Sequence, residues 1–174
     1  SQPVSGVQRY EIECCRKIKK KYKECVVLAP PDIRNAAVAA ELGAVVVGTR
    51  TGHAWEQIDL PRHLRRLGSP PLWNPCNTAP LCYNNNFNTL LDLAFYYYPQ
   101  WNSRAFALWY NILVPRIVRG SRHVFTVSHT VKGDITAVYG VPAHKVSITY
   151  NGLSDAMMVG SDGQRKEKIV FAVG

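Results

Sequence analysis

Residues 123–152 read HVFTVSHTVKGDITAVYGVPAHKVSITYNG. The run at 123–127 is rich in β-branched residues and predicts a strand, and Ser128 can cap the helix that follows it. Gly140, with Pro142 two residues later, is typical of the end of a helix. Residues 146–150 predict a second strand. This strand–helix–strand order is typical of a parallel sheet, in which helices connect neighbouring strands.

The same alternation extends towards the amino terminus. Apolar side chains recur every three or four residues from 6 to 22, which predicts one face of a helix. Further helices are predicted at 35–42, at 55–67 with a break or restart at Pro61, and at 102–120, which Pro115 should kink or divide. Short strands are predicted at 25–29, 44–47, 72–73 and 87–91. We therefore expect an α/β fold with a Rossmann-like parallel sheet flanked by helices.

Three segments are expected along the chain. Residues 1–152 form one domain, residues 153–168 a polar linker that contains SDGQRKEK, and residues 169–174 (IVFAVG) the first strand of a second, truncated domain. The segment PVSGV at 3–7 stands where a loop from a first strand to a first helix would stand, although no strand precedes it. We therefore also expect the first strand of the sheet to be missing.

Composition limits the classes of protein and partner. The chain has 174 residues, 47% apolar and 19% charged, which excludes a disordered or fibrous protein. Its net charge of +9 suits an anionic membrane surface, phosphorylated ligands or nucleic acid, but no nucleic-acid-binding motif is present and we expect no nucleic-acid partner. The five cysteines are odd in number and contain no C-x-x-C, so neither a disulfide framework nor a zinc site is indicated. No apolar run approaches the ~20 residues that cross a bilayer.

Polar side chains follow the predicted strands, where an open parallel sheet binds its ligands. They include Asn77, Thr78, Asp92, Ser128 and Asn151. A carboxylate such as Asp92 can orient a hydroxyl or accept a proton there, although an Asp in a turn equally caps neighbouring N–H groups.

Two further features at helix starts have competing interpretations. Ser5 and Gly6 can bring backbone N–H groups of the first helix to a phosphate, or they can form a plain turn. Ser128 stands beside His129, but no G-x-S-x-G surrounds the serine and an N-cap already explains it, so we do not predict a hydrolase.

Two clusters of side chains could face solvent or a partner. A basic run follows Arg16 and ends the first predicted helix; its lysines are Lys17, Lys19, Lys20, Lys21 and Lys23. These lysines form either a solvated helix face or a surface that faces an anionic membrane. The second cluster is aromatic and consists of Phe95, Tyr96, Tyr97, Tyr98 and Trp101. We expect at least half of it in the core, with a sugar-stacking or membrane-edge surface as the alternatives.

An ordered set of short motifs resembles a known family. SGVQRY at 5–10 is followed by LDLAF at 91–95 with YP at 98–99, then by FTVS at 125–128, YGVP at 139–142 and NG at 151–152. Together they resemble the amino-terminal half of family 4 glycosyltransferases of the GT-B fold. The resemblance extends from Val4 to Gly174.

The resemblance implies one lobe of an enzyme with two Rossmann-like domains across a cleft. The amino-terminal domain mainly receives the acceptor, and the missing carboxyl-terminal domain binds most of the nucleotide-sugar donor. Gly6 and its neighbours would face the donor diphosphate and the acceptor, Ser128 would line the cleft, and Asn151 would stand where the chain leaves the first domain.

The same resemblance implies a function. The reaction would retain the anomeric configuration of the sugar and would need no metal or other cofactor. The acceptor would be a saccharide or lipid-linked hydroxyl in bacterial polysaccharide or glycolipid synthesis. We expect a cytoplasmic protein, peripheral at the inner face of the membrane, and we expect this fragment alone to be inactive.

One departure from the family pattern leaves two hypotheses. The family strand usually ends in His-Asp, whereas this chain has Leu91 followed by Asp92. The chain is therefore either half of an active transferase, with Asp92 as its candidate catalytic residue, or a non-catalytic binding module derived from the family.

Overall fold

Parallel strands form two separate sheets in residues 6–152, the part of the chain that the computed structural model describes. The larger sheet has the order β3 (Leu72–Asn74), β4 (Asn86–Thr89), β5 (His123–Thr126) and β6 (Val146–Ile148). The smaller pairs β1 (Leu28–Ala29) with β2 (Val45–Val46). All strands of the larger sheet are parallel, so the polar segments that leave them lie at one edge of the sheet.

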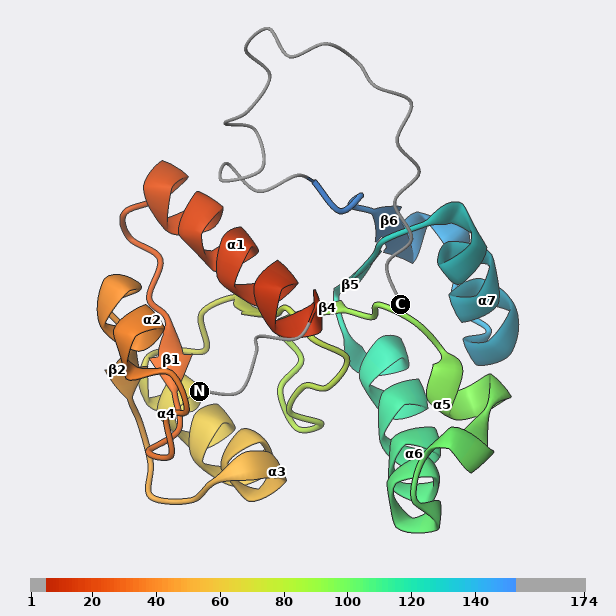
Figure 1. The fold of residues 1–174 in the computed structure, drawn as a ribbon, viewed down its shortest axis with the longest axis horizontal. Coiled ribbons are helices and arrows are strands. Elements are labelled where there is room, and N and C mark those ends of the chain that lie inside the picture. Colours follow the sequence, from red (N-terminus) through yellow and green to blue (C-terminus); the bar gives the residue numbers. More distant parts are fainter. Residues whose placement is uncertain (1–5, 153–174) are drawn as a thin grey trace, which may run out of the picture.

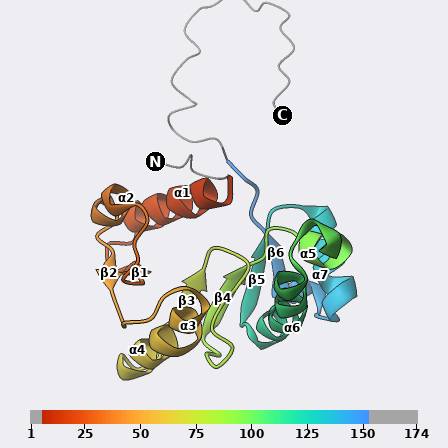
Figure 2. The ribbon, with the colours of Figure 1, turned by 60° about the horizontal axis from the view of Figure 1, so that its bottom comes forward.

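Helices connect these strands and lie on two sides of the molecule (Figure 1). On one side α1 (Gly6–Lys21) and α2 (Ala36–Glu41) accompany the small sheet, followed by α3 (Gly52–Ala54), a π-helical turn η1 (Trp55–Asp59) and α4 (Leu60–Arg66). On the other side lie α5 (Ala94–Tyr97), the 3-10 turn η2 (Pro99–Trp101), α6 (Arg104–Gly120) and α7 (His129–Tyr139), with a 3-10 turn η3 (Ala143–Lys145) before β6. Figure 2 shows the same division from a second direction. The predicted α/β fold with parallel strands flanked by helices is confirmed.

Helix ends lie where the sequence predicts them. The Ser128 hydroxyl accepts the Val131 N–H at the start of α7, and Gly140 ends that helix with φ +64°. Asn35 caps α2, and the left-handed Gly43 (φ +56°) follows it. The strands are shorter than predicted. β1 covers Leu28–Ala29 of the predicted 25–29, and β6 covers Val146–Ile148 of the predicted 146–150. The predicted linker at 153–168 and strand at 169–174, like Ser5, lie outside the described residues.

The helix at 55–67 is restarted before Pro61, as predicted, by a turn of π-helix. Leu60 N–H donates to the carbonyl of Trp55, five residues earlier, and α4 continues with Pro61 in its first turn. A proline has no N–H to donate, so its place in the first turn of α4 breaks no helical hydrogen bond. Pro115 behaves differently, because α6 runs through it without being divided.

The main core lies between the larger sheet, α6 and α7. Its buried members include Leu90, Val114, Val118, Val124 and Ile135. The large apolar residues of α6 are buried only in part. Leu113 and Ile117 are buried, but Phe106 and Trp109 are 37% and 40% exposed. Val114 and Val118, in the second half of α6, belong to the main core, whereas the Trp109 ring lies 6.0 Å from the His53 ring of α3.

The aromatic cluster is mostly on the surface, so the expectation that half of it is core is wrong. Phe95 is buried against Tyr110, with ring centroids 5.4 Å apart. Tyr96, Tyr97, Tyr98 and Trp101 are all exposed, the last at 69%. The short α5 and η2 turn only one side towards α6, so one aromatic ring of the cluster is covered there.

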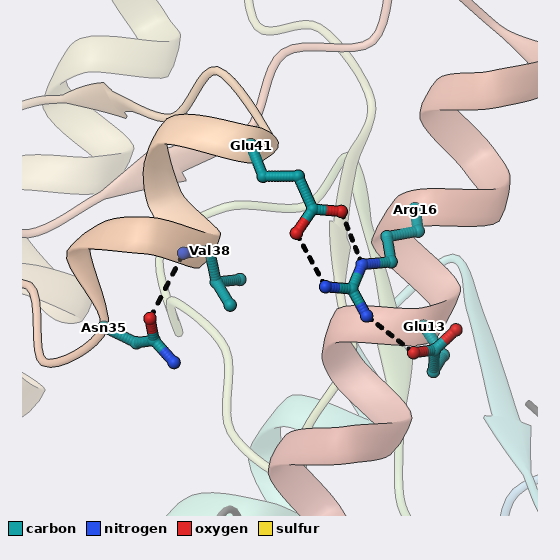
Figure 3. A network of polar contacts seen from close by, with 5 residues as sticks. All are labelled: Glu13, Arg16, Asn35, Val38 and Glu41. Atoms are coloured by element: carbon teal, nitrogen blue, oxygen red, sulfur yellow. Dashed lines mark hydrogen bonds and ion pairs between the residues drawn. The ribbon is translucent and has the colours of Figure 1, made fainter. Parts of the chain in front are cut away.

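A fork of ion pairs joins α1 to α2 (Figure 3). The Arg16 guanidinium donates from Nε and Nη2 to the two carboxylate oxygens of Glu41, both at 2.6 Å, and from Nη1 to Glu13 at 2.7 Å. The hydrogen bonds from Arg16 hold the pKa of Glu41 below its ordinary value. Arg16 is therefore a structural cation, committed within the protein.

A second anchor holds the loop after β2. Asp59 Oδ2 accepts the N–H groups of Arg50 at 2.8 Å and Thr49 at 2.9 Å, and its Oδ1 accepts from the Arg50 guanidinium at 2.6 Å. These backbone hydrogen bonds hold the pKa of Asp59 below its ordinary value. Gly48 (φ +77°) lies so close that a Cβ there would be 2.4 Å from Asp59 Oδ2.

Candidate functional site

The candidate site is the edge of the larger sheet where its parallel strands end. The chain leaves β3 towards Asn77, leaves β4 at Leu91 and Asp92, and leaves β5 at Ser128. Thr149, just after β6, donates its N–H to the carbonyl of Thr126 at 2.7 Å, which keeps the last two strands paired up to the edge.

Asn77 joins the segments that leave β3 and β4. Its side-chain oxygen accepts the Leu91 N–H at 3.0 Å, and its backbone carbonyl accepts from the Asn88 amide at 3.3 Å. Asn77 adopts φ +32°, a conformation that asparagine tolerates better than most residues. The neighbouring Thr78 donates its N–H to the carbonyl of Cys76, which tightens this turn. Asn77 therefore fixes where Leu91 and Asp92 lie.

Asp92 is exposed at this edge. Its Oδ1 accepts the Ala94 N–H at 3.0 Å and so caps the start of α5. This is the turn interpretation that the sequence left open. It uses one carboxylate oxygen, and the charge of Asp92 still acts on its surroundings, because Asp92 contributes to raising the pKa of Cys76.

The first turns of α1 reach this edge from the opposite side of the molecule. The Tyr10 hydroxyl makes side-chain hydrogen bonds with Thr149 and with Thr89 of β4, so it touches two of the segments that end there. Burial raises the pKa of Tyr10. Figure 1 shows the amino-terminal end of α1 beside β4.

Next to Tyr10, a half-buried carboxyl interacts with a half-buried thiol. The Cys76 thiol donates to the Glu11 carboxylate; burial raises the pKa of Glu11, and the hydrogen bond offsets part of that rise. Burial, followed by Glu11, raises the pKa of Cys76 to about 12. The sequence analysis missed this pair, although Glu11 stands four residues after Val7, on the inward side of the predicted helix.

The comparisons with known proteins concern this same region. Residues 78–156 match the family described as Glycosyltransferase Family 4. The predicted resemblance to family 4 glycosyltransferases is confirmed over these residues. Over 165 residues it is 33% identical to the "O-antigen chain mannosyltransferase RfbU" of Salmonella typhimurium (strain LT2), an alignment that covers 92% of this chain. The chain spans 44% of the length of that relative. No solved structure matches the chain.

The family 4 match begins directly after Asn77 and includes β4, β5 and β6 with the segments that leave them. Asp92 and Ser128 therefore lie inside the matched region, while Tyr10 and Glu11 reach the same edge from α1 outside it. Leu91, where the family pattern has histidine, is half-buried and held through its N–H by Asn77. A hydrophobic side chain thus occupies the end of β4 beside Asp92.

The other predicted site residues lie as follows. Gly6 is the exposed first residue of α1, and no heavy atom lies within 4 Å of where its Cβ would be, so its surroundings in the described part of the chain would admit a side chain. Ser128 uses its hydroxyl as the cap of α7. Asn151 is exposed next to the last described residue. Thr78 is half-buried behind Asn77.

The predicted membrane-facing lysines do not all face outward. Lys19 is half-buried, and its ammonium group donates to the carbonyl of Leu42 at the end of α2, at 2.5 Å. The exposed members of the run are Lys17, Lys20, Lys21 and Lys23. The Lys21 ammonium lies 5.2 Å from the centre of the Tyr22 ring.

Two features are absent from residues 6–152. No three His, Cys, Asp or Glu side chains in that range gather in a way that could hold a metal ion. Within the same range, no helix has both the length and the hydropathy that crossing a bilayer requires.

Proposed function

We propose that this chain is the amino-terminal, acceptor-side half of a retaining glycosyltransferase that moves a sugar from a nucleotide-sugar donor to an acceptor hydroxyl. The observation that carries the proposal is the similarity, over 92% of the chain, to an O-antigen chain mannosyltransferase. That similarity supports a role in bacterial polysaccharide or glycolipid synthesis, with a saccharide or lipid-linked acceptor. The proposed domain ends at residue 152, with a linker at 153–168 and the donor-side domain from 169.

In this proposal Asp92 receives the acceptor. Its Oδ1 is engaged by the Ala94 N–H, which leaves Oδ2 to orient an acceptor hydroxyl or to accept its proton. Asn77 acts as a positioning residue, because its hydrogen bond to Leu91 fixes the turn that presents Asp92. Gly6, Thr78, Ser128 and Asn151 are proposed to border the same cleft.

The chemistry breaks the bond between the anomeric carbon and the phosphate oxygen and forms a bond from that carbon to the acceptor oxygen on the same face of the sugar. The acceptor proton leaves to a base or to the departing phosphate. A departing diphosphate needs cations or N–H donors to stabilise its charge. We propose that the donor-side domain supplies that charge and that this half alone is inactive.

The test is sugar transfer by the full-length protein, measured as incorporation of label from UDP- and GDP-hexoses into lipid or polysaccharide fractions. Asp92→Asn keeps the oxygen that caps Ala94 and removes the charge, so the transfer rate should fall with little change in thermal stability. Asp134→Asn is the matched control, because Asp134 is a carboxylate of α7 that accepts from the Tyr97 hydroxyl. Equal rates for the two variants would remove Asp92 from the reaction.

Leu91 favours a second candidate, a non-catalytic binding module. It replaces the histidine of the family pattern and fills the end of β4 with an apolar side chain. Leu91→His in the full-length protein separates the two candidates. Transfer by the natural protein supports the enzyme, whereas transfer that appears only in the histidine variant supports the module.

We also propose that α1 contacts the cytoplasmic face of the membrane. Each basic residue near an anionic surface contributes about 1 kcal/mol, and Lys20, Lys21 and Lys23 are exposed. Flotation on neutral and anionic vesicles measures this contribution. Equal recovery on both would end the electrostatic part of the proposal.

A further inference from the structure

The outer helices enclose a hollow that the sugar-transfer proposal does not use. It has a volume of about 570 Å³ and lies between α5, α6 and α7, on the side of the molecule away from α1 (Figures 1 and 2). Ile112 and Val138 form apolar parts of its wall, and Arg116, Arg119 and Tyr139 form polar parts. A hollow with both kinds of lining suits a ligand that has an apolar and a charged part.

Tyr139 presents the first sign of a missing partner. The residue is 2% exposed, and its hydroxyl makes no hydrogen bond to any described residue. A buried hydroxyl without a partner is unfavourable, and a phenol can donate its proton to an acceptor oxygen. Burial raises the pKa of Tyr139, so the hydroxyl stays protonated; its oxygen is itself buried, so it donates to a ligand only where the wall of the hollow moves.

Arg116 and Arg119 present the second sign of a missing partner. Arg116 donates from Nη1 to the Ile112 carbonyl at 2.6 Å, and Arg119 donates from Nε to the Tyr139 carbonyl at 3.0 Å. Neither forms an ion pair with a carboxylate of residues 6–152. They stand three residues apart on α6, so they share one side of the helix. The remaining guanidinium N–H groups suit the oxygens of a phosphate.

None of the residues that line the hollow is acidic. From residue 93 to 133 the sequence contains no Asp or Glu, and the first that follows, Asp134, accepts from the Tyr97 hydroxyl. The rim carries Tyr96, Ile112 and, one helical turn before it on α6, Leu108; they are 44%, 43% and 65% exposed. Exposed tyrosine and aliphatic side chains beside arginines are typical of a surface that enters the headgroup layer of a bilayer.

We propose that this hollow binds the phosphate of an acidic membrane lipid, with Arg116, Arg119 and the Tyr139 hydroxyl as its donors and the rim of Tyr96, Leu108 and Ile112 in the headgroup layer. The site is separate from the proposed sugar-transfer edge. Its helices α5, α6 and α7 lie on the other side of the molecule from α1 in both views, so the α1 lysines belong to a different surface.

The test is binding of the complete 174-residue chain to vesicles of phosphatidylcholine alone or with phosphatidylglycerol, followed by flotation. The chain should float with phosphatidylglycerol vesicles and much less with neutral ones. Arg116→Gln with Arg119→Gln should weaken binding at least about tenfold, since two cations are removed. Lys20→Gln with Lys21→Gln is the matched control and should leave most of the binding.

Tyr139→Phe tests the hydroxyl separately. It should weaken vesicle binding several-fold while the thermal stability stays equal or rises, because an unpartnered buried hydroxyl is removed. Leu108→Ser should weaken binding to the same anionic vesicles without altering any donor. Unchanged binding in the arginine pair, or loss confined to the α1 lysine pair, would overturn the proposal.

Two further arms identify the source of the phosphate. Inorganic phosphate and glycerol 3-phosphate are added as competitors, and their binding is measured by calorimetry. Tight binding of either one, abolished by the arginine pair, together with no preference for anionic vesicles, would assign the hollow to a soluble phosphate and overturn the lipid proposal. No sugar donor is present in these measurements, so their failure is distinguishable from failure of the proposed transferase function.

Discussion

Gly48→Ala should destabilise the protein by about 3 kcal/mol, through two effects that the structure separates. Gly48 has φ +77°, and a residue with a Cβ in the left-handed region is destabilised by roughly 1–2 kcal/mol. The new Cβ would also lie 2.4 Å from Asp59 Oδ2 and 2.5 Å from Asp59 Cβ. Overpacking of this kind costs about 1–3 kcal/mol.

Asp59 cannot simply move aside. Its Oδ2 accepts the N–H groups of Thr49 and Arg50, so a shift that relieves the contact breaks the hydrogen bonds that hold the loop after β2. For a chain of this size, about 3 kcal/mol corresponds to a fall in melting temperature of roughly 6–12 °C. Urea unfolding followed by tryptophan fluorescence and by circular dichroism measures the change directly.

Two other glycines serve as matched controls. Gly68 has nearly the same φ (+79°) but no heavy atom within 4 Å of its Cβ position, so Gly68→Ala isolates the backbone effect. Gly133 lies inside α7 with open space around it, and alanine there should stabilise by about 0.5–1 kcal/mol. If Gly48→Ala proved no more harmful than Gly68→Ala, the close packing against Asp59 would be refuted.

Three further predictions concern buried groups. Thr126 Oγ1 is buried without a partner in the described residues, so Thr126→Val should stabilise the protein by about 1 kcal/mol in urea unfolding. Thr89→Val removes the acceptor of the Trp73 indole N–H at 3.0 Å and should destabilise the protein by a similar amount. The same sign for both variants would contradict this assignment. Because the pKa of Asp59 is lowered in the folded state, its stabilising effect is complete above the ordinary carboxyl pKa and is lost as pH falls through the folded value; Asp59→Asn should therefore flatten the acid side of a plot of stability against pH. Cys76, with a pKa of about 12, should react with iodoacetamide at about pH 8 at least a hundredfold more slowly than the exposed Cys82, and equal rates in the folded protein would mean that the Glu11 contact is absent.

The sequence predicts local structure well wherever a single residue type decides it. Ser128 and Gly140 bound α7 as predicted, because a capping hydroxyl and a left-handed glycine act on their own helix. The sequence predicts the burial of a side chain poorly, because burial depends on which element packs against its helix. Trp109 and Leu113 stand four residues apart on one side of α6, yet Leu113 is buried and Trp109 is 40% exposed, because periodicity does not show how far along a helix its packing partner extends.

The site shows the same limit. Parallel strands bring Asn77 and Asp92 to one edge, and this follows from the predicted parallel sheet alone. The pairing of Glu11 with Cys76 depends on where α1 lies against the sheet, which the pattern of α1 does not contain. Helical spacing does place Glu11 on the inward side, so a buried carboxyl on an apolar helix face was the available signal.

The charges of the described residues are distributed in a way that bears on both proposals. At the sheet edge, burial and the neighbouring carboxylates of Glu11, Asp92 and Glu56 raise the pKa of Cys76. The arginines of the hollow, Arg116 and Arg119, lie on the outer helices instead. An edge of this kind can receive a neutral acceptor hydroxyl, but it opposes the approach of a diphosphate until cations from elsewhere join it. The chain alone should therefore bind UDP or GDP weakly. Substitution of Arg116 and Arg119 in the hollow should weaken the binding of any anion more than substitution of Asp92 does.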